Sequence, residues 1–276
     1  MRKMAEINGS GVGFYYKNNN YVLRNADFTI EPGKMTAILG KNGCGKSTLV
    51  KLITALLPLS EGTITIHGKD IREAEGVRTV RKHCGIVFQN PDNQFVSPVI
   101  EDDIKFGLSN HQVPEPEQAG RIREALEAVD LSGFEKRSIH TLSGGQKQRA
   151  ASAGILALRS DILIFDEAAS MLDPEGKAEL VKCIEKQRDL GKTIIVITQN
   201  ITDIIHADRI LLMAEGKIIA GGTPREILTD IGLLECAGLR APFPVRVFDD
   251  LRNEGILLPF CPITPEELAE AVCSYH

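Results

Sequence analysis

Residues 40–47 read Gly40-Lys-Asn-Gly-Cys-Gly-Lys46-Ser47, and they lie between the apolar run MTAIL at 35–39 and the apolar-periodic stretch TLVKLITALL at 48–57. The apolar run predicts a buried strand, and the stretch after the loop predicts a helix that ends before Pro58. Glycines let the loop backbone curl so that successive N–H groups point inward, beside the positive end of the helix dipole. Both features stabilise phosphate oxygens, so we predict that this loop binds a nucleotide.

The side chains of the loop fit a magnesium–nucleotide complex. We expect Lys46 to reach the β- and γ-phosphates and the Ser47 hydroxyl to take a Mg²⁺ position. The loop residues expected to surround the nucleotide are Gly40, Asn42, Gly43, Cys44, Gly45, Lys46, Ser47 and Thr48. This loop alone leaves kinases, GTPases and motor proteins open, because proteins of all three classes can use it.

A second element is an apolar strand that ends in two carboxylates, DILIF at 161–165 followed by Asp166 and Glu167. A continuous apolar strand is typical of a parallel sheet that is covered on both faces. Asp166 is suited to hold Mg²⁺, and Glu167 is suited to polarise the attacking water as a general base. Apolar strands that end in acidic residues are common, so this element is only moderately specific on its own. It indicates a nucleotide site in combination with the other motifs.

The most specific element is Leu142-Ser-Gly-Gly-Gln146, which is followed by Lys147-Gln148-Arg149. On these residues the chain resembles the ATP-binding cassette (ABC) ATPases, whose signature is LSGGQ. The resemblance implies that the signature of one subunit packs over the γ-phosphate of ATP held by the other subunit. The residues that would do so are Ser143, Gly144, Gly145 and Gln146. A serine and glycine amides at a helix start can bind an anion.

Three further residues match landmarks of the family. Tyr16 matches the aromatic residue that stacks on adenine, although an aromatic residue near a strand is more often part of the core. Gln89 ends the apolar run CGIVFQ and matches the Q-loop glutamine, which senses Mg²⁺ and the attacking water. Asp173 matches the D-loop, which crosses to the partner's site, and it is also suited to cap the helix that Pro174 opens.

The resemblance implies an α/β fold of the P-loop NTPase class. It consists of a RecA-like core, an antiparallel β subdomain, a helical signature subdomain at about 91–158, and a small C-terminal domain. We expect the ATPase domain to occupy residues 1–230 and a dimerisation region to occupy 231–276, where Gly and Pro recur and strand–helix alternation stops.

Local patterns add several elements. We expect two strands within 21–39, one strand over GTITIHGKD, a strand over CGIVFQ and another over TIIVIT. A helix is predicted from Pro174 to Leu190, with Gly191 after it. A hairpin should turn at Glu215-Gly216, and two capping boxes should open helices, at Thr223–Glu226 and at Thr264–Glu267.

Composition limits the classes of partner. The 276 residues carry a net charge of −5, so no basic surface for nucleic acid is expected. No apolar run approaches the roughly 18 residues of a membrane span, and the N-terminal residues have no apolar core of a signal peptide. Six scattered cysteines without a CxxC pair fit a reducing compartment. We therefore expect a cytoplasmic protein whose membrane role depends on a partner.

One landmark is altered, because the family carries a switch histidine after the strand that follows the D-loop helix. Here TIIVIT is followed by Gln199 and Asn200. Glutamine can donate a hydrogen bond to the γ-phosphate but cannot become cationic. We predict that the site on this chain's own loop hydrolyses slowly; the alternative is that Gln199 is tolerated and both sites work. His206 lies seven residues further on, about 10 Å along a helical path, so we expect it to be too distant to replace Gln199.

The segments FQNPDNQFV, DEAASMLDP and the tail from 235 resemble the ATPase subunits of energy-coupling factor transporters, which import vitamins and transition-metal ions. The resemblance implies a second ABC ATPase as partner, in a heterodimer or alternatively a homodimer. It also implies a transmembrane coupling protein and a membrane substrate-binding subunit, at the cytoplasmic face of the cell membrane. Alternatives are the ATPase of a cobalt, nickel or other importer, a regulatory subunit that hydrolyses little ATP, and a soluble cassette protein of DNA repair or translation.

Overall fold

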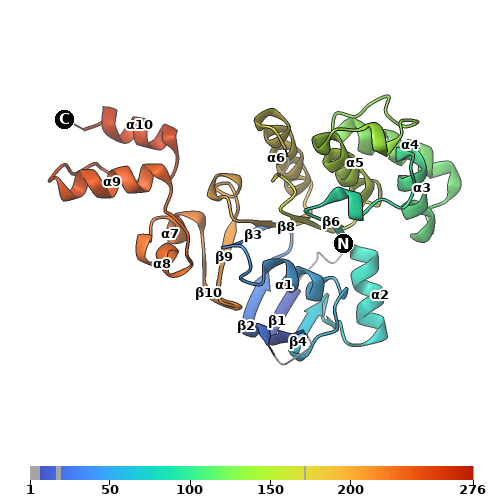
Figure 1. The fold of residues 1–276 in the computed structure, drawn as a ribbon, viewed down its shortest axis with the longest axis horizontal. Helices are drawn as coiled ribbons and strands as arrows, with labels where there is room; N and C mark the ends of the chain where they lie inside the picture. The colour runs from blue at the N-terminus through green and yellow to red at the C-terminus, as the bar shows by residue number, and fades with distance from the viewer. Residues whose placement is uncertain (1–6, 17–19, 171, 276) are drawn as a thin grey trace.

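A computed structural model of the chain describes residues 7–16, 20–170 and 172–275. Its strands form two sheets, one small and antiparallel and one larger and mainly parallel. Figure 1 shows the small sheet below the large one, a lobe of helices at one side, and the C-terminal helices at the other side. This arrangement confirms the predicted α/β fold with a β subdomain and a helical lobe.

The small sheet has the order β2(Tyr21–Ile30), β1(Ile7–Tyr15), β4(Glu61–Ile66) and β5(Lys69–Asp70), and all of its pairings are antiparallel. The expectation of one strand over GTITIHGKD was wrong. His67 and Gly68 both have positive φ values, 51° and 74°, and they turn the chain back on itself between β4 and β5. Two consecutive residues of this kind form the tight turn that matches the twist of a hairpin.

The large sheet has the order β10(Lys217–Gly222), β9(Arg209–Ala214), β3(Met35–Gly40), β8(Thr193–Thr198), β7(Ile162–Asp166) and β6(Cys84–Val87). All pairings are parallel except that of β10 with β9. Three central strands, β3, β7 and β8, are buried along their whole length. Their carboxyl ends lie along one edge of the sheet, so the loops that follow them are brought together there.

The predicted hairpin at Glu215-Gly216 is confirmed, since both residues have positive φ and join β9 to β10. Strand β6 is shorter than predicted and ends at Val87, two residues before Gln89. The helices are α1(Lys46–Ile53), α2(Ala74–His83), α3(Ile100–Asn110), α4(Glu115–Ala128), α5(Gly144–Ala157), α6(Pro174–Asp189), α7(Pro224–Leu228), α8(Ile231–Cys236), α9(Phe243–Asn253) and α10(Pro265–Cys273). Short 3-10 turns occupy Pro91–Asn93, Ile139–Thr141 and Ile201–Asp203.

Helix α1 ends earlier than the apolar pattern predicts. Ala55 adopts a positive φ of 53°, and the Thr54 hydroxyl donates to the carbonyl oxygen of Val50 at 2.8 Å. These two local features stop the helix at Ile53, although apolar residues continue to Leu57.

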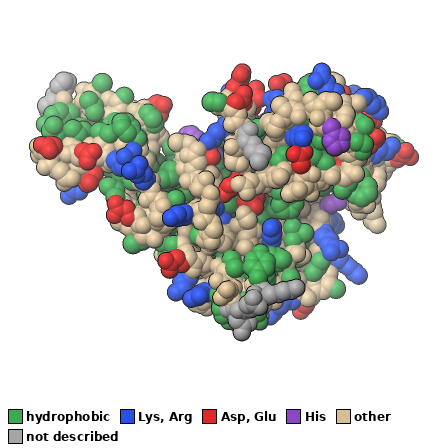
Figure 2. Space-filling view, viewed as in Figure 1, with side chains coloured by type: hydrophobic (Ala, Val, Ile, Leu, Met, Phe, Trp, Pro, Cys, Tyr) green, Lys and Arg blue, Asp and Glu red, His purple; other side chains and the backbone are tan. Residues whose placement is uncertain are grey.

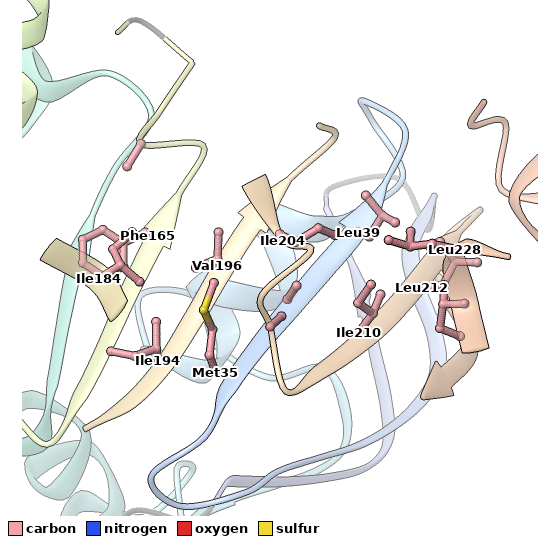
Figure 3. Packing of buried hydrophobic residues seen from close by; sticks show 14 of the residues in the cluster. Met35, Leu39, Phe165, Ile184, Ile194, Val196, Ile204, Ile210, Leu212 and Leu228 are labelled. Atoms are coloured by element: carbon pink, nitrogen blue, oxygen red, sulfur yellow. The ribbon is translucent and has the colours of Figure 1, made fainter. Parts of the chain in front are cut away.

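Buried apolar side chains form layers on both faces of the large sheet. One layer packs the sheet and α1 against the small sheet. The other fills the opposite face, and Figure 3 shows part of it, with Met35, Phe165 and Val196 projecting from three strands and Ile184 from α6. A third cluster lies within the helical lobe. The sheet edge that carries the loops is thus fixed by packing on both sides.

The C-terminal region is joined to this core. Leu234 of α8 and Val245 of α9 belong to the same apolar layer as β3 and β8. Arg225 of α7 donates to the carbonyl oxygen of Cys261 at 2.8 Å and forms an ion pair with Glu267 of α10. Figure 1 shows α9 and α10 extending away from the large sheet. Among the described residues, no helix is long and apolar enough to cross a membrane.

The two predicted capping boxes differ. At α7, the Thr223 hydroxyl accepts from the Glu226 amide and the Glu226 carboxylate accepts from the Thr223 amide, so the box is complete. At α10, Thr264 accepts from the Glu267 amide, but the Glu267 carboxylate accepts from the amide of Ile263 instead. The second expectation was therefore right for the cap and wrong for the reciprocal bond, because Glu267 also pairs with Arg225.

Candidate nucleotide-binding site

The glycine loop joins the end of β3 to the start of α1 and borders a cavity of about 270 Å³. Among the described residues, those that line it are Val22, Asn42, Gly43, Gly45, Lys46, Ser47, Thr48, Gln89 and Glu167. Gly43 and Gly45 have φ values of 82° and 108°, which side-chain-bearing residues rarely adopt. A Cβ on Gly45 would also lie 2.8 Å from Cδ2 of Leu23. The loop conformation therefore depends on these glycines.

Lys46 lies at the floor of this cavity and is only 4% exposed. Its ammonium donates to the carbonyl oxygens of Gly40 at 2.7 Å and Lys41 at 3.1 Å, and it lies 3.9 Å from a carboxylate oxygen of Glu167. The loop backbone thus holds the cation in place. A cation fixed in this way needs little rearrangement to meet a phosphate.

The cavity offers oxygen donors that suit Mg²⁺. The Ser47 hydroxyl donates to a carboxylate oxygen of Asp166 at 3.0 Å, which joins α1 to the end of β7. Burial raises the pKa of Asp166, while the hydrogen bond from Ser47 opposes this effect. A hydroxyl and a carboxylate are hard oxygen ligands, the kind that Mg²⁺ prefers. The residues present therefore fit the ion that the sequence predicts.

Gln89 and Glu167 both line the cavity and contact each other. The Gln89 amide nitrogen donates to a carboxylate oxygen of Glu167 at 2.7 Å. The amide of Glu167 donates to the carbonyl oxygen of Ile197 at 2.9 Å, and its φ of 49° lies in the left-handed region. This backbone conformation is unfavourable for a residue with a side chain, and here it turns the carboxylate toward Lys46.

Gln199 follows the end of β8 and is exposed. It lines a neighbouring cavity of about 280 Å³, which Glu167 also borders, together with Asn200 and Asp203. Glu167 thus connects the two cavities. The assumed helical path from Gln199 to His206 was wrong: a 3-10 turn occupies Ile201–Asp203, and the carbonyl of His206 accepts from Arg188 at 3.0 Å.

The signature segment borders a different cavity, of about 610 Å³. Ser143, Gly144, Gly145 and Gln146 line it from the start of α5, and Asp173 lines it from the start of α6. Among the described residues, this cavity and the one at the glycine loop share no lining residue. One chain thus presents the signature and the D-loop aspartate together, away from its own glycine loop. Met171, within the D-loop stretch, lies outside the described residues.

Ser143 and Asp173 both serve as helix caps. The Ser143 hydroxyl accepts from the Gln146 amide at 3.2 Å, while the Gln146 side-chain oxygen accepts from the Ser143 amide at 3.0 Å. The Asp173 carboxylate accepts from the amide of Gly176 at 2.9 Å. The structural role that the sequence suggested for Asp173 is therefore present, and the Gln146 side chain is engaged with its own helix.

Sequence reasoning missed two contacts between the signature helix and the Q-loop. Gln148, which is 1% exposed, donates to the carbonyl oxygen of Phe88 at 3.1 Å, and Lys147 pairs with Asp92 at 2.7 Å. Both residues directly follow the signature, but their partners are about 60 residues earlier in the chain, so no local pattern could identify them. They fix the start of α5 against the segment that follows Gln89.

Tyr16 is 47% exposed and contacts Phe14 edge-to-face, with ring centroids 4.9 Å apart. It is therefore a surface aromatic residue rather than part of the core. Among the described residues, the small sheet contributes Val22 to the lining of the loop cavity, and Tyr16 is not one of the lining residues. The role of Tyr16 in stacking on adenine therefore stays a prediction.

Comparisons with known proteins agree with this geometry. The profile of the ABC transporter family matches residues 23–170. The chain is 42% identical to the energy-coupling factor transporter ATP-binding protein EcfA1 of Enterococcus faecalis, over 98% of this chain and 97% of that protein. It is 44% identical to EcfA1 of Geobacillus kaustophilus, over 99% of each chain.

Solved structures show the same fold. The structure of cbiO1 from Clostridium perfringens, described as part of the ABC transporter complex cbiONQ, has a TM-score of 0.75 and 34% identity, and the match covers 90% of this chain and all of that one. A dimeric ATP-binding cassette in a post-hydrolysis state, bound to ADP and Pi, has a TM-score of 0.74 and 26% identity over 79% of this chain and 99% of that one. The chain therefore belongs to the ABC transporter family, and within it to the ATP-binding proteins of energy-coupling factor transporters.

Proposed function

We propose that this chain is the ATP-binding and ATP-hydrolysing subunit of an energy-coupling factor importer, with MgATP bound between it and a second ATPase subunit. The observation that carries the proposal is the separation of the two half-sites. Lys46, Ser47 and Glu167 border one cavity, while Ser143 and Asp173 border another. Since the family signature acts on the γ-phosphate, a complete site needs the loop half of one chain and the signature half of another.

The roles of the residues follow from their positions. Mg²⁺, when bound, supplies positive charge to the β- and γ-phosphates. Ser47 and Asp166 are the residues that would hold it, and Lys46 neutralises phosphate charge from the floor of the cavity. Gln89 orients the Glu167 carboxylate, which accepts the proton of the attacking water. The signature serine and glycine amides of the partner then close the site from the other side.

The partners proposed are a second ABC ATPase, a transmembrane coupling protein and a membrane substrate-binding subunit. A heterodimer is our first choice, because Gln199 at the switch position suits a pair of unequal sites. The chain would then act at the cytoplasmic face of the cell membrane, as a peripheral subunit. Its cargo would be a vitamin or a metal ion, selected by the membrane subunit rather than by this chain.

The same glutamine supports a second candidate, a subunit that closes on ATP but hydrolyses little of it. Gln199 cannot carry the positive charge of a histidine, so it neutralises less of the transition-state charge. Glu167 favours the first candidate, because its carboxylate lies at the loop cavity beside Lys46.

The test is the ATPase activity of the assembled membrane complex that carries Glu167→Gln in this chain. Loss of a general base lowers turnover by about 10²- to 10⁴-fold at the affected site. We expect own-site turnover to fall by at least about a hundredfold, with ATP retained and the dimer held closed. Glu73→Gln, which changes an exposed residue directly before α2, is the matched control. Unchanged turnover in Glu167→Gln would reject the hydrolysing subunit and favour the subunit that hydrolyses little ATP. A complex that never retains MgATP would refute both candidate functions.

A further inference from the structure

Two histidines and an aspartate from three different elements meet at the junction of the two sheets. His67 lies in the turn between β4 and β5, His83 is the last residue of α2, and Asp161 directly precedes β7. One potential ligand atom from each side chain lies within 4.8 Å of the other two. Figure 1 shows α2 beside the small sheet and close to β6, which is where these elements converge.

The contacts within the group are specific. Nδ1 of His83 lies 2.6 Å from one carboxylate oxygen of Asp161, and the rings of His67 and His83 meet edge-on with centroids 5.0 Å apart. An ion pair alone needs only His83 and Asp161. The second imidazole, brought in by the β4–β5 turn, adds a third ligand to the same point.

We propose that His67, His83 and Asp161 form a binding site for a divalent transition-metal ion of the zinc class. Two imidazole nitrogens and one carboxylate oxygen are the ligand set that such ions prefer, whereas Mg²⁺ and Ca²⁺ prefer oxygen alone. Three protein ligands leave a fourth position for water, and the side chains of His83 and Asp161 are 27% and 25% exposed, which gives the ion access.

The geometry needs little adjustment to accept the ion. Ligands of a tetrahedral zinc at ~2.0–2.1 Å lie roughly 3.3 Å from one another. The widest separation in the group therefore closes by at most about 1.5 Å, and the His83–Asp161 contact opens by about 0.7 Å. The ion takes the place of the direct contact between these two side chains.

Neighbouring groups support the aspartate as a ligand. The ammonium of Lys192 lies 3.9 Å from Oδ1 of Asp161, while His83 faces Oδ2. Lys192 is itself held by the carbonyl oxygens of Arg159 at 3.0 Å and Ser160 at 2.6 Å. At this ion-pair distance the Lys192 ammonium faces the carboxylate oxygen that His83 does not contact. The bound ion joins the turn of the small sheet to the residue that directly precedes β7, a central strand of the large sheet.

The experiment is a zinc titration of the purified full chain against a chromophoric chelator, without nucleotide and with excess Mg²⁺ to occupy oxygen-only sites. We expect one equivalent bound at micromolar zinc. His67→Asn and His83→Asn should each weaken binding by at least tenfold, and the double variant should lose it. His140→Asn and His206→Asn, which change exposed histidines outside the group, are matched controls and should bind as the unaltered chain does.

Two further readouts separate this site from the cysteines and from misfolding. The Co²⁺ form should show visible d–d bands without the charge-transfer band that thiolate ligands produce. Zinc should raise the unfolding midpoint of the unaltered chain but not of the double variant, which should still bind ATP at Lys46. No binding at micromolar zinc, unchanged affinity in the double variant, or a thiolate band would each overturn the site. None of these residues lines the loop cavity, so the outcome is independent of the proposed function.

Discussion

Gln199 is a neutral residue that lines the same cavity as Glu167. Replacing it with histidine tests how much a positive charge at this position contributes to the rate of ATP hydrolysis. We expect Gln199→His to raise turnover at this chain's own site by about tenfold or more, since one donor to developing charge is worth about 10²–10³ in rate. The measurement is single-site turnover in a complex whose partner site has been inactivated. Asn200→His, at the next exposed position, is the control. Equal rates for Gln199→His and the unaltered chain would refute the slow-site hypothesis.

Cys44 gives a pH-dependent prediction at the glycine loop. Burial raises the pKa of its thiol, although the charge of Lys46 opposes this effect. Because only the thiolate is nucleophilic, a raised pKa lowers its reactive fraction at neutral pH. We expect iodoacetamide to label Cys44 more slowly than the exposed Cys236, with a rate that rises about tenfold per pH unit below the pKa of Cys44. Peptide mass spectrometry across that range measures it; a flat pH profile would contradict the prediction.

The residues around the loop cavity also indicate how far sequence can predict a site. Asn42, Lys46 and Ser47 border one cavity with Gln89 and Glu167, as their motifs suggest. The left-handed backbone of Glu167 could not be predicted, because it depends on the hydrogen bond to Ile197 on another strand. Motifs thus identify the groups at the site, while their orientation depends on the assembled sheet.

At the scale of single elements, the complete capping box of α7 can be compared with the partial one of α10. Thr223→Ala should lower the free energy of unfolding by about 1 kcal/mol, the usual cost of removing an N-cap side chain. The hydrogen bonds from Thr223 lower the pKa of Glu226. Their stabilising effect is therefore present at neutral pH and is lost as the pH falls through that lowered value.

The control for this change is Thr264→Ala, where the reciprocal bond is absent. Denaturant unfolding of both variants at neutral and acidic pH measures the difference. We expect the effect of Thr223→Ala to shrink more on acidification than that of Thr264→Ala. Equal shrinkage in the two variants would contradict a stabilising hydrogen bond from the Thr223 hydroxyl to the Glu226 carboxylate.

Elements with strong apolar patterns were predictable and those without them were not. The runs MTAIL, DILIF and TIIVIT gave the central strands because they are buried on both faces. Helix α2 was not predicted, since only Gly76 and Val80 are buried in it. Gly76 marks a close approach instead: a Cβ there would lie 1.8 Å from the carbonyl oxygen of Asp70. Such a contact between elements leaves no periodic trace in the sequence.

At the scale of the whole molecule, the two separate cavities predict that substitutions in one chain affect different sites. Lys46→Ala should abolish nucleotide binding at this chain's own loop, because it removes the buried cation. Ser143→Arg should leave that binding intact and damage the partner's site, where the signature would lie. Photocrosslinking with an azido-ATP in the assembled complex shows which subunit is labelled. The same labelling pattern for both variants would rule out sites shared between chains.

The C-terminal region is packed against the ATPase core. The proposed domain boundary at 230 lies where the strand–helix alternation of the sequence stops. Leu234 and Val245, which follow it, nevertheless pack into the apolar layer that covers β3 and β8. We expect a chain truncated after Asp230 to unfold at a lower temperature than the full chain, because it exposes part of that layer. A truncated chain of equal stability would favour an autonomous C-terminal domain.

The left-handed backbone at Glu167 has a consequence for any redesign of this protein. A glycine or asparagine there would relieve about 1–2 kcal/mol of conformational cost and would look like an improvement to a procedure that ranks substitutions by fold alone. The same exchange would delete the carboxylate that faces Lys46. Thermal robustness and catalytic output therefore oppose each other at this single residue, and a thermostabilised variant must leave it untouched.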